Sequence, residues 1–138
     1  MEKLDGLRPR ALQSKDAVEL LSDKWRIVVL HLLTAGPLRA SKLQRAIPRV
    51  SPKMLTQTLR GLERDGLVGR QVFTVVPARV EYQLTHMGES VIPLLRRLCH
   101  WAKAHVPERD EARRRFDAGI RNSSGGRRRP GGPVGAGR

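Results

Sequence analysis

Hydrophobic residues recur with helical spacing between positions 52 and 65. Three leucines fall at i, i+4 and i+7 and share one face: Leu55, Leu59 and Leu62. Ser51 is a preferred N-cap residue, Pro52 suits the first helical position, and Gly66 suits the residue after a helix end. The opposite face carries polar and basic side chains: Lys53, Thr56, Gln57, Arg60 and Arg64. We therefore predict an amphipathic helix over 52–65 with a basic free face.

A second helix is predicted directly before it, over residues 40–47. Leu43 and Ile47 supply its apolar side, and Pro48 ends it because proline cannot continue the hydrogen-bond ladder. Only a very short turn separates the two helices, so they must cross at a steep angle. This is the helix-turn-helix arrangement, with 52–65 as its recognition helix.

Two more helices are predicted upstream. Residues 15–21 form an amphipathic segment after Ser14, which is a suitable N-cap. Residues 24–35 are almost entirely apolar, which predicts a helix buried on most of its circumference and ended by Gly36. Residues 1–13 show no comparable pattern, and we expect an N-terminal arm there that is either loosely ordered or docked on a partner chain.

The period of the pattern changes from helical to alternating after Gly66. Residues 67–74 and 79–84 alternate at a period of two on either side of a turn that contains Pro77. Such alternation predicts a β-hairpin. A hairpin that directly follows a recognition helix is a wing, so the fold class is mainly α with a small β-hairpin, a winged helix-turn-helix.

The last predicted helix begins at Thr85 and ends near Pro107, and the charged residues 108–116 form either a short extension of it or a frayed one. Its apolar stripe indicates a surface that needs a second subunit: Val91, Leu94, Leu95, Leu98 and Trp101. From Gly119 the chain is rich in Gly, Arg, Pro and Ser and predicts disorder. The expected organisation is an arm over 1–13, a winged helix-turn-helix DNA-binding and dimerisation domain over 14–106, and a charged, Arg- and Gly-rich, disordered tail over 107–138.

The net charge of the chain narrows the possible classes of binding partner. The chain of 138 residues has 27 Lys and Arg against 13 Asp and Glu, a formal net charge of +14. Residues 1–120 alone hold 22 basic and 13 acidic residues, so the excess is not confined to the tail. Such an imbalance favours a polyanion, and double-stranded DNA before a membrane surface.

The same composition argues against secretion and membrane insertion. The N-terminus has charged residues and no apolar signal segment, and the longest apolar run, 27–33, is too short to span a bilayer. Cys99 is the single cysteine, so no disulfide can form within one chain. We expect a reduced, cytoplasmic protein without a membrane partner.

Side-chain chemistry assigns candidate DNA contacts. Lys53, Thr56 and Gln57 lie on the first exposed turns of the recognition helix, which reach deepest into a major groove, and are the base-edge candidates. The phosphate or wing candidates are Arg49, Ser51, Arg60 and Arg79. Arg79 has two interpretations of equal weight, entry into a minor groove or a structural ion pair with Glu81 or Glu63.

Other function classes find less support. No metal-ligand spacing, phosphate loop or nucleophile–base arrangement occurs, so we predict neither an enzyme nor a cofactor. A winged-helix protein-docking module and a DNA-coating protein without sequence preference remain alternatives. A coating protein needs only Lys and Arg on the exposed helix face, whereas Thr56 and Gln57 favour base recognition.

Several short blocks occur in a fixed order along the chain: Asp23-Lys24-Trp25, Gly36-Pro37-Leu38-Arg39, Ile47-Pro48, Val50 to Thr56, Leu62 to Val68, Val76-Pro77, Arg79 to Thr85, Gly88 and Trp101. Over roughly residues 14–105 this order resembles the HxlR-type winged helix-turn-helix transcriptional regulators of bacteria. The resemblance implies a homodimer held by the first and last helices, bound to a palindromic operator.

One departure from the family concerns cysteine. Many members carry a redox-sensing cysteine shortly before the first helix, where this chain has Leu12-Gln13-Ser14. The thiol switch of those members is therefore not expected here. Cys99 is expected to be a packing residue. No residue set identifies an effector, the operator sequence or the sign of regulation.

Overall fold

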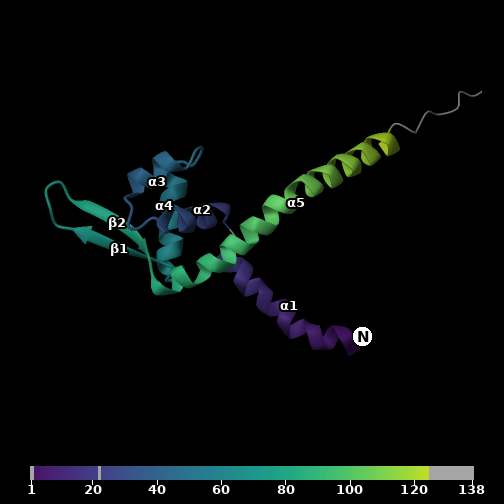
Figure 1. Ribbon diagram of the computed structural model, residues 1–138, viewed down its shortest axis with the longest axis horizontal. Helices are drawn as coiled ribbons and strands as arrows, with labels where there is room; N and C mark the ends of the chain where they lie inside the picture. The colour runs from purple at the N-terminus through teal and green to yellow at the C-terminus, as the bar shows by residue number, and fades with distance from the viewer. Residues whose placement is uncertain (1, 22, 125–138) are drawn as a thin grey trace, which may run out of the picture. The chain divides into compact units, whose positions relative to one another are not determined.

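The computed structural model describes residues 2–21 and 23–124 (Figure 1). Five helices and one hairpin follow each other along this part of the chain: α1 Glu2–Leu20, α2 Lys24–Leu33, α3 Ala40–Ala46, α4 Pro52–Arg64, β1 Val68–Phe73, β2 Arg79–Leu84 and α5 His86–Ser124. The prediction of a mainly helical chain with one small hairpin is confirmed. The chain divides between Arg96 and Arg97 into two compact units.

The hydrophobic core lies in the first unit, where α2, α3 and α4 pack beside the hairpin (Figure 1). Asp23 caps α2 by accepting a hydrogen bond from the Trp25 backbone N–H at 2.9 Å. The buried aliphatic side chains of the core come from α2, α3, α4, β1, the first part of α5 and the connections between them: Val29, Leu30, Leu33, Leu43, Ile47, Val50, Leu55, Leu59, Leu62, Leu67, Val68, Ile92 and Leu95. Close-packed side chains on the core-facing side of α3 and α4 thus hold the helix-turn-helix in place.

The hairpin is tied to the helices at its base. Strands β1 and β2 are antiparallel, with pairs running from Val68–Leu84 to Phe73–Arg79. The link between α2 and α3 pairs with β2: Leu38 and Tyr82 exchange two backbone hydrogen bonds of 2.9 and 2.8 Å. The wing is therefore hydrogen-bonded to the segment that leads into α3.

Helix α1 corrects two predictions. It begins at Glu2, so the expected loose arm over 1–13 and the expected helix start at Ser14 were wrong. Ser14 lies inside the helix and its hydroxyl donates to the Ala11 carbonyl at 2.6 Å. Pro9 lies inside the helix as well. The neighbouring Leu, Arg, Ala and Gln residues are good helix formers, which offsets the hydrogen bond that proline removes.

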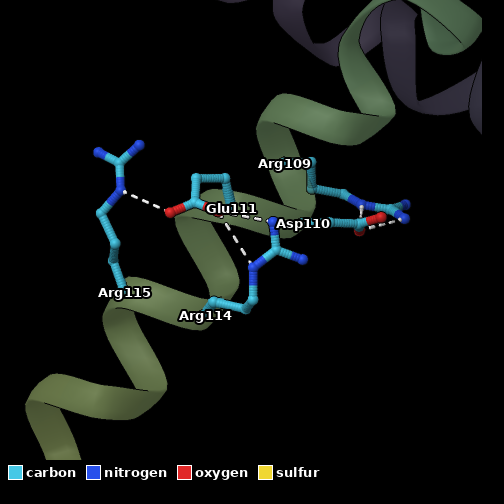
Figure 2. A network of polar contacts seen from close by, with 5 residues as sticks. All are labelled: Arg109, Asp110, Glu111, Arg114 and Arg115. Atoms are coloured by element: carbon cyan, nitrogen blue, oxygen red, sulfur yellow. Dashed lines mark hydrogen bonds and ion pairs between the residues drawn. The ribbon is translucent and has the colours of Figure 1, made fainter.

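Helix α5 also extends beyond its expected end at Pro107, continuing to Ser124. Ion pairs within the helix accompany this extension (Figure 2): Glu111 pairs with Arg114 at 2.6 Å and with Arg115 at 3.5 Å. Pairs at i+3 and i+4 stabilise a helix that has little tertiary packing. Residues 107–124 of the tail predicted to be disordered are helical, so that prediction was wrong there, and 125–138 lie outside the described residues. None of the helices in the described ranges has the length and apolarity that a membrane crossing requires.

The start of α5 yields a stability prediction. The Thr85 hydroxyl accepts from the Gly88 N–H at 3.0 Å, and a Cβ at Gly88 would collide with the Leu67 carbonyl oxygen. We expect Gly88→Ala to lower the free energy of unfolding by about 1–3 kcal/mol, the usual cost of overpacking. Urea unfolding at matched protein concentration measures this. The control is Gly119→Ala on the same helix, where a Cβ meets nothing within 4 Å. Equal midpoints for both variants would contradict the predicted collision.

Candidate nucleic-acid interface

The recognition helix α4 begins and ends as its sequence predicts. The Ser51 hydroxyl accepts from the Met54 N–H at 3.1 Å, which satisfies one of the free donors of the first turn. Pro52 occupies the first turn, and Asp65 is the C-cap residue. Gly66 follows with a φ of +76°, a left-handed conformation that favours glycine.

The two faces of α4 separate as expected. Its three leucines are buried in the core, whereas the five polar and basic residues of the predicted free face are exposed: Lys53, Thr56, Gln57, Arg60 and Arg64. The amphipathic prediction is therefore confirmed. A rigid helix presents these side chains at its surface, and its packing does not require them.

The base-edge candidates differ in what they can offer a base. The Thr56 hydroxyl donates to the Pro52 carbonyl at 2.9 Å, so its proton is used inside the helix. Its methyl group and the oxygen's acceptor capacity remain for a ligand. The side chains of Lys53 and Gln57 make no hydrogen bond or ion pair within the described residues. Their donors, and the Gln57 carbonyl, are available.

The turn before α4 holds two of the phosphate candidates. Arg49 is exposed and has a φ of 68°, an uncommon conformation for a residue other than glycine. The Gln44 side-chain amide donates to the carbonyl of buried Val50 and closes this turn. Ser51 uses its oxygen as the helix cap, and its hydroxyl proton can still be donated outward.

Arg79 in the wing is engaged within the protein. Its Nε lies 3.5 Å from a Glu81 carboxylate oxygen, and its guanidinium lies 4.4 Å from the Phe73 ring centroid. Of the two interpretations of Arg79, the structure contains the ion pair with Glu81. Glu63 instead lies 3.7 Å from Arg70. Entry of Arg79 into a minor groove stays a prediction.

The polar contacts that join α4 to Asp23 and Arg26 were not predicted from the sequence. The Thr58 hydroxyl donates to Asp23 at 3.0 Å, and Arg26 pairs with Asp65 at 2.6 Å. Thr58 is buried although it is polar, and it lies on the side of α4 that faces α2. A threonine next to a leucine in the stripe was the available signal, but its partner is 35 residues away and could not be identified from local pattern.

The dimerisation candidates on α5 fall into two groups. Leu94, Leu98 and Trp101 are 62%, 49% and 59% exposed, as a surface for a second subunit requires. Val91 packs partly against the core, and Leu95 is 1% exposed inside it. The assignment of Leu95 to a dimer surface was therefore wrong, since its side chain fills the core of its own chain.

Cys99 also differs from expectation. Its side chain is exposed, so its interpretation as a packing residue of the single chain was wrong. Helical periodicity placed it near the apolar side of α5, but the core receives only the first part of that side, through Ile92 and Leu95.

Comparison with known protein families decides which family the chain belongs to. A model of the HxlR-like helix-turn-helix family matches residues 20–110, which include α2 to β2 and the first part of α5. The chain belongs to this family. Its wing, recognition helix and core described above are those of an HxlR-like winged helix-turn-helix transcriptional regulator, and the resemblance inferred from the sequence blocks is confirmed.

Similar proteins agree with this assignment. A protein of Methanothermobacter thermautotrophicus named as an uncharacterized HTH-type transcriptional regulator is 49% identical over 89 residues, covering 64% of this chain and 68% of that protein. YkvN of Bacillus subtilis, named in the same way, is 49% identical over 83 residues, covering 60% of this chain and 70% of its own length.

Solved structures share the fold. The putative HTH-type transcriptional regulator YtcD superposes with a TM-score of 0.64 at 41% identity, covering 67% of this chain and 95% of that one. The reduced form of HypR, described as a redox regulator, gives a TM-score of 0.65 at 30% identity over 67% of this chain and 92% of its own. This family consists of regulators rather than enzymes.

The cap of α4 allows a direct test of how the interface is held. We expect Ser51→Ala to lower the free energy of unfolding by about 0.5–2 kcal/mol, because the Met54 N–H is left without its acceptor. Thermal and urea unfolding measure the change. Ser51→Asn is the matched control, since asparagine caps as well as serine does and should retain stability. Equal stability of the alanine variant and the wild type would show that the cap contributes nothing.

Proposed function

We propose that the protein is a homodimeric, sequence-specific regulator that binds a palindromic operator. Helix α4 enters the major groove of each half-site, and the wing, residues 67–84, lies against the flanking minor groove. The observation that carries this proposal is the exposed face of α4, which combines cations with neutral hydrogen-bonding groups on a helix fixed by buried leucines.

Distinct roles follow for the exposed side chains. Gln57 has the paired donor and acceptor that adenine requires, and Lys53 suits guanine. The Thr56 methyl group suits the methyl group of thymine, because the hydroxyl proton is already bonded to Pro52. Arg49, Ser51 and Arg60 are assigned to phosphates on either side of the groove.

The wing has a charge-bearing edge for the minor groove. Arg70 is 50% exposed, and Arg79 is 36% exposed despite its pairing with Glu81. In the proposed complex the Arg79 guanidinium exchanges Glu81 for the electronegative groove, whose negative potential is strongest where A·T-rich sequences narrow it. This exchange keeps the cation paired in both states.

Dimerisation is proposed to use α1 and α5. Exposed aliphatic side chains recur along α1, including Leu4, Leu7, Leu12 and Val18, and α5 exposes Leu94, Leu98 and Trp101. Apolar surface of this extent on helices is typical of an interface between subunits. Two recognition helices related by a two-fold axis then meet two half-sites about one helical turn of DNA apart. The protein acts in the cytoplasm with double-stranded DNA as its partner, and no effector is assigned.

We expect substitutions on α4 to separate base contacts from phosphate contacts. Gln57→Ala should weaken binding to the preferred duplex by about 1–3 kcal/mol and leave a scrambled duplex unaffected, because it removes a base contact. Arg60→Gln should weaken binding to both duplexes and reduce the salt slope by about 0.9, the amount expected when one phosphate is no longer neutralised. Fluorescence anisotropy across a salt series, on the duplex that the wild type enriches from a random-sequence library, measures both.

The alternatives have their own outcomes in that experiment. A protein that enriches no sequence but binds all duplexes with a steep salt slope is a DNA-coating protein. A protein that binds no duplex is a docking module. Either result would refute sequence-specific regulation.

The dimer is tested on α5. We expect Leu94→Glu combined with Leu98→Glu to yield a monomer, because the two charges would be buried without partners in the interface. Sedimentation equilibrium measures the mass, and affinity for the full operator should fall with it because the half-sites are no longer bound together. Lys103→Glu, an exposed charge change on the opposite face of the same helix, should leave the mass unchanged. A dimer that survives the double substitution would refute this interface.

A further inference from the structure

Helix α4 is held to α2 by a polar stripe that is separate from its leucines. Thr58, Gly61 and Asp65 fall at i, i+3 and i+7, so they share one face of the helix. Each of the three positions contacts a side chain from the first turn of α2 or its cap, namely Asp23 or Arg26.

Asp23 contributes the first contact. One carboxylate oxygen caps α2 through the Trp25 N–H at 2.9 Å, and the other accepts from the Thr58 hydroxyl at 3.0 Å. Thr58 is 3% exposed. The same carboxylate therefore starts α2 and holds the middle of α4.

Arg26 contributes the other two contacts. Its Nη1 donates to Asp65 at 2.6 Å and to the backbone carbonyl of Leu20 at 3.1 Å. Its Nη2 lies over Gly61, where a Cβ would come within 2.5 Å of it. The side chain is only 16% exposed. One guanidinium thus joins the last residue of α1 to the C-cap residue of α4.

The two kinds of contact control different properties. The leucines supply most of the burial that holds α4 against the core, but the hydrophobic effect itself is non-directional. The hydrogen bonds at the two ends of the polar stripe are directional, and a shift of α4 would leave partly buried charges without partners. The polar stripe therefore adds a constraint on the angle at which α4 presents Lys53, Thr56 and Gln57.

We propose that Arg26 is a positioning residue for base recognition, and that it couples the orientation of α4 to the end of α1. The proposal depends on the proposed function, since it assumes that α4 recognises bases. Arg26 itself does not contact DNA. Base contacts need placement within a fraction of an ångström, whereas contacts with phosphates tolerate displacement. Removal of Arg26 therefore lowers specificity rather than general affinity.

Arg26→Gln tests this in the full chain. We expect the affinity for the duplex selected by the wild type to fall about tenfold, while the affinity for a scrambled duplex and the salt slope stay unchanged. Arg26→Lys should behave similarly, because one ammonium group lacks the guanidinium fork. Arg113→Gln, an exposed charge neutralisation on α5, is the matched control and should leave both affinities at their wild-type values.

A second variant guards against impaired folding. Gly61→Ala keeps all charges and favours the helical conformation by up to about 1 kcal/mol, yet its Cβ displaces the Arg26 guanidinium. We expect the same reduction of specificity. Because this variant retains or gains helix propensity, weaker binding from it cannot be attributed to partial unfolding of α4.

Hydrogen exchange tests the coupling to α1. In the wild type, the selected duplex should slow amide exchange in residues 15–21 as well as in α4. In Arg26→Gln the slowing should persist in α4 and disappear in residues 15–21. A purely structural role for Arg26 would not separate the two segments.

The contrary results are distinct from failure of the proposed function. If the wild type selects no sequence, the proposed function fails. If it selects one and the Arg26 and Gly61 variants bind it with wild-type affinity, the positioning role alone is refuted. Equally weakened binding to both duplexes, with a salt slope lower by about 0.9, would make Arg26 a phosphate contact instead. Slowed exchange in residues 15–21 that survives in Arg26→Gln would refute the coupling.

Discussion

Leu55, Leu59 and Leu62 anchor the recognition helix, and every other part of the DNA-binding surface depends on that anchorage. Full burial of a leucine side chain contributes about 1.5–3 kcal/mol, so three of them account for much of what holds α4 in place. Because α4 packs against the core through its apolar face, the side chains on its opposite face are not needed for packing. Lys53, Thr56 and Gln57 are therefore available for recognition without a cost in stability.

That division explains how much the sequence could predict. The leucine period, the Ser51 cap, the Pro52 start and the Gly66 stop are all local signals, and together they predicted α4 within one residue of its observed end. The alternation around Pro77 likewise predicted both strands. These elements are specified by neighbours in the chain, and so their pattern is readable without tertiary information.

The errors arose where distant residues decide. Leu95 and Leu94 are adjacent and equally apolar, and only the position of the core shows that the first is buried and the second exposed. Thr58 pairs with a residue 35 positions away, and Arg26 with one 39 positions away, separations that no periodicity reports. At Pro107 a local signal misled instead. The general preference of proline for helix ends was overruled in a helix that continues with the good helix formers Glu108, Arg109 and Ala112.

The bridge between Leu38 and Tyr82 has a consequence for the DNA itself. Leu38 leads into α3, and Tyr82 lies in the wing, so the two hydrogen bonds make the helix-turn-helix and the wing a single body. In the proposed complex, such a body keeps the major-groove contacts of α4 and the minor-groove contacts of the wing at a constant separation along the duplex. The length of a half-site then matters as much as its base sequence. One base pair inserted between the two contact zones displaces every contact on one side at once, whereas one exchanged base pair removes a single contact.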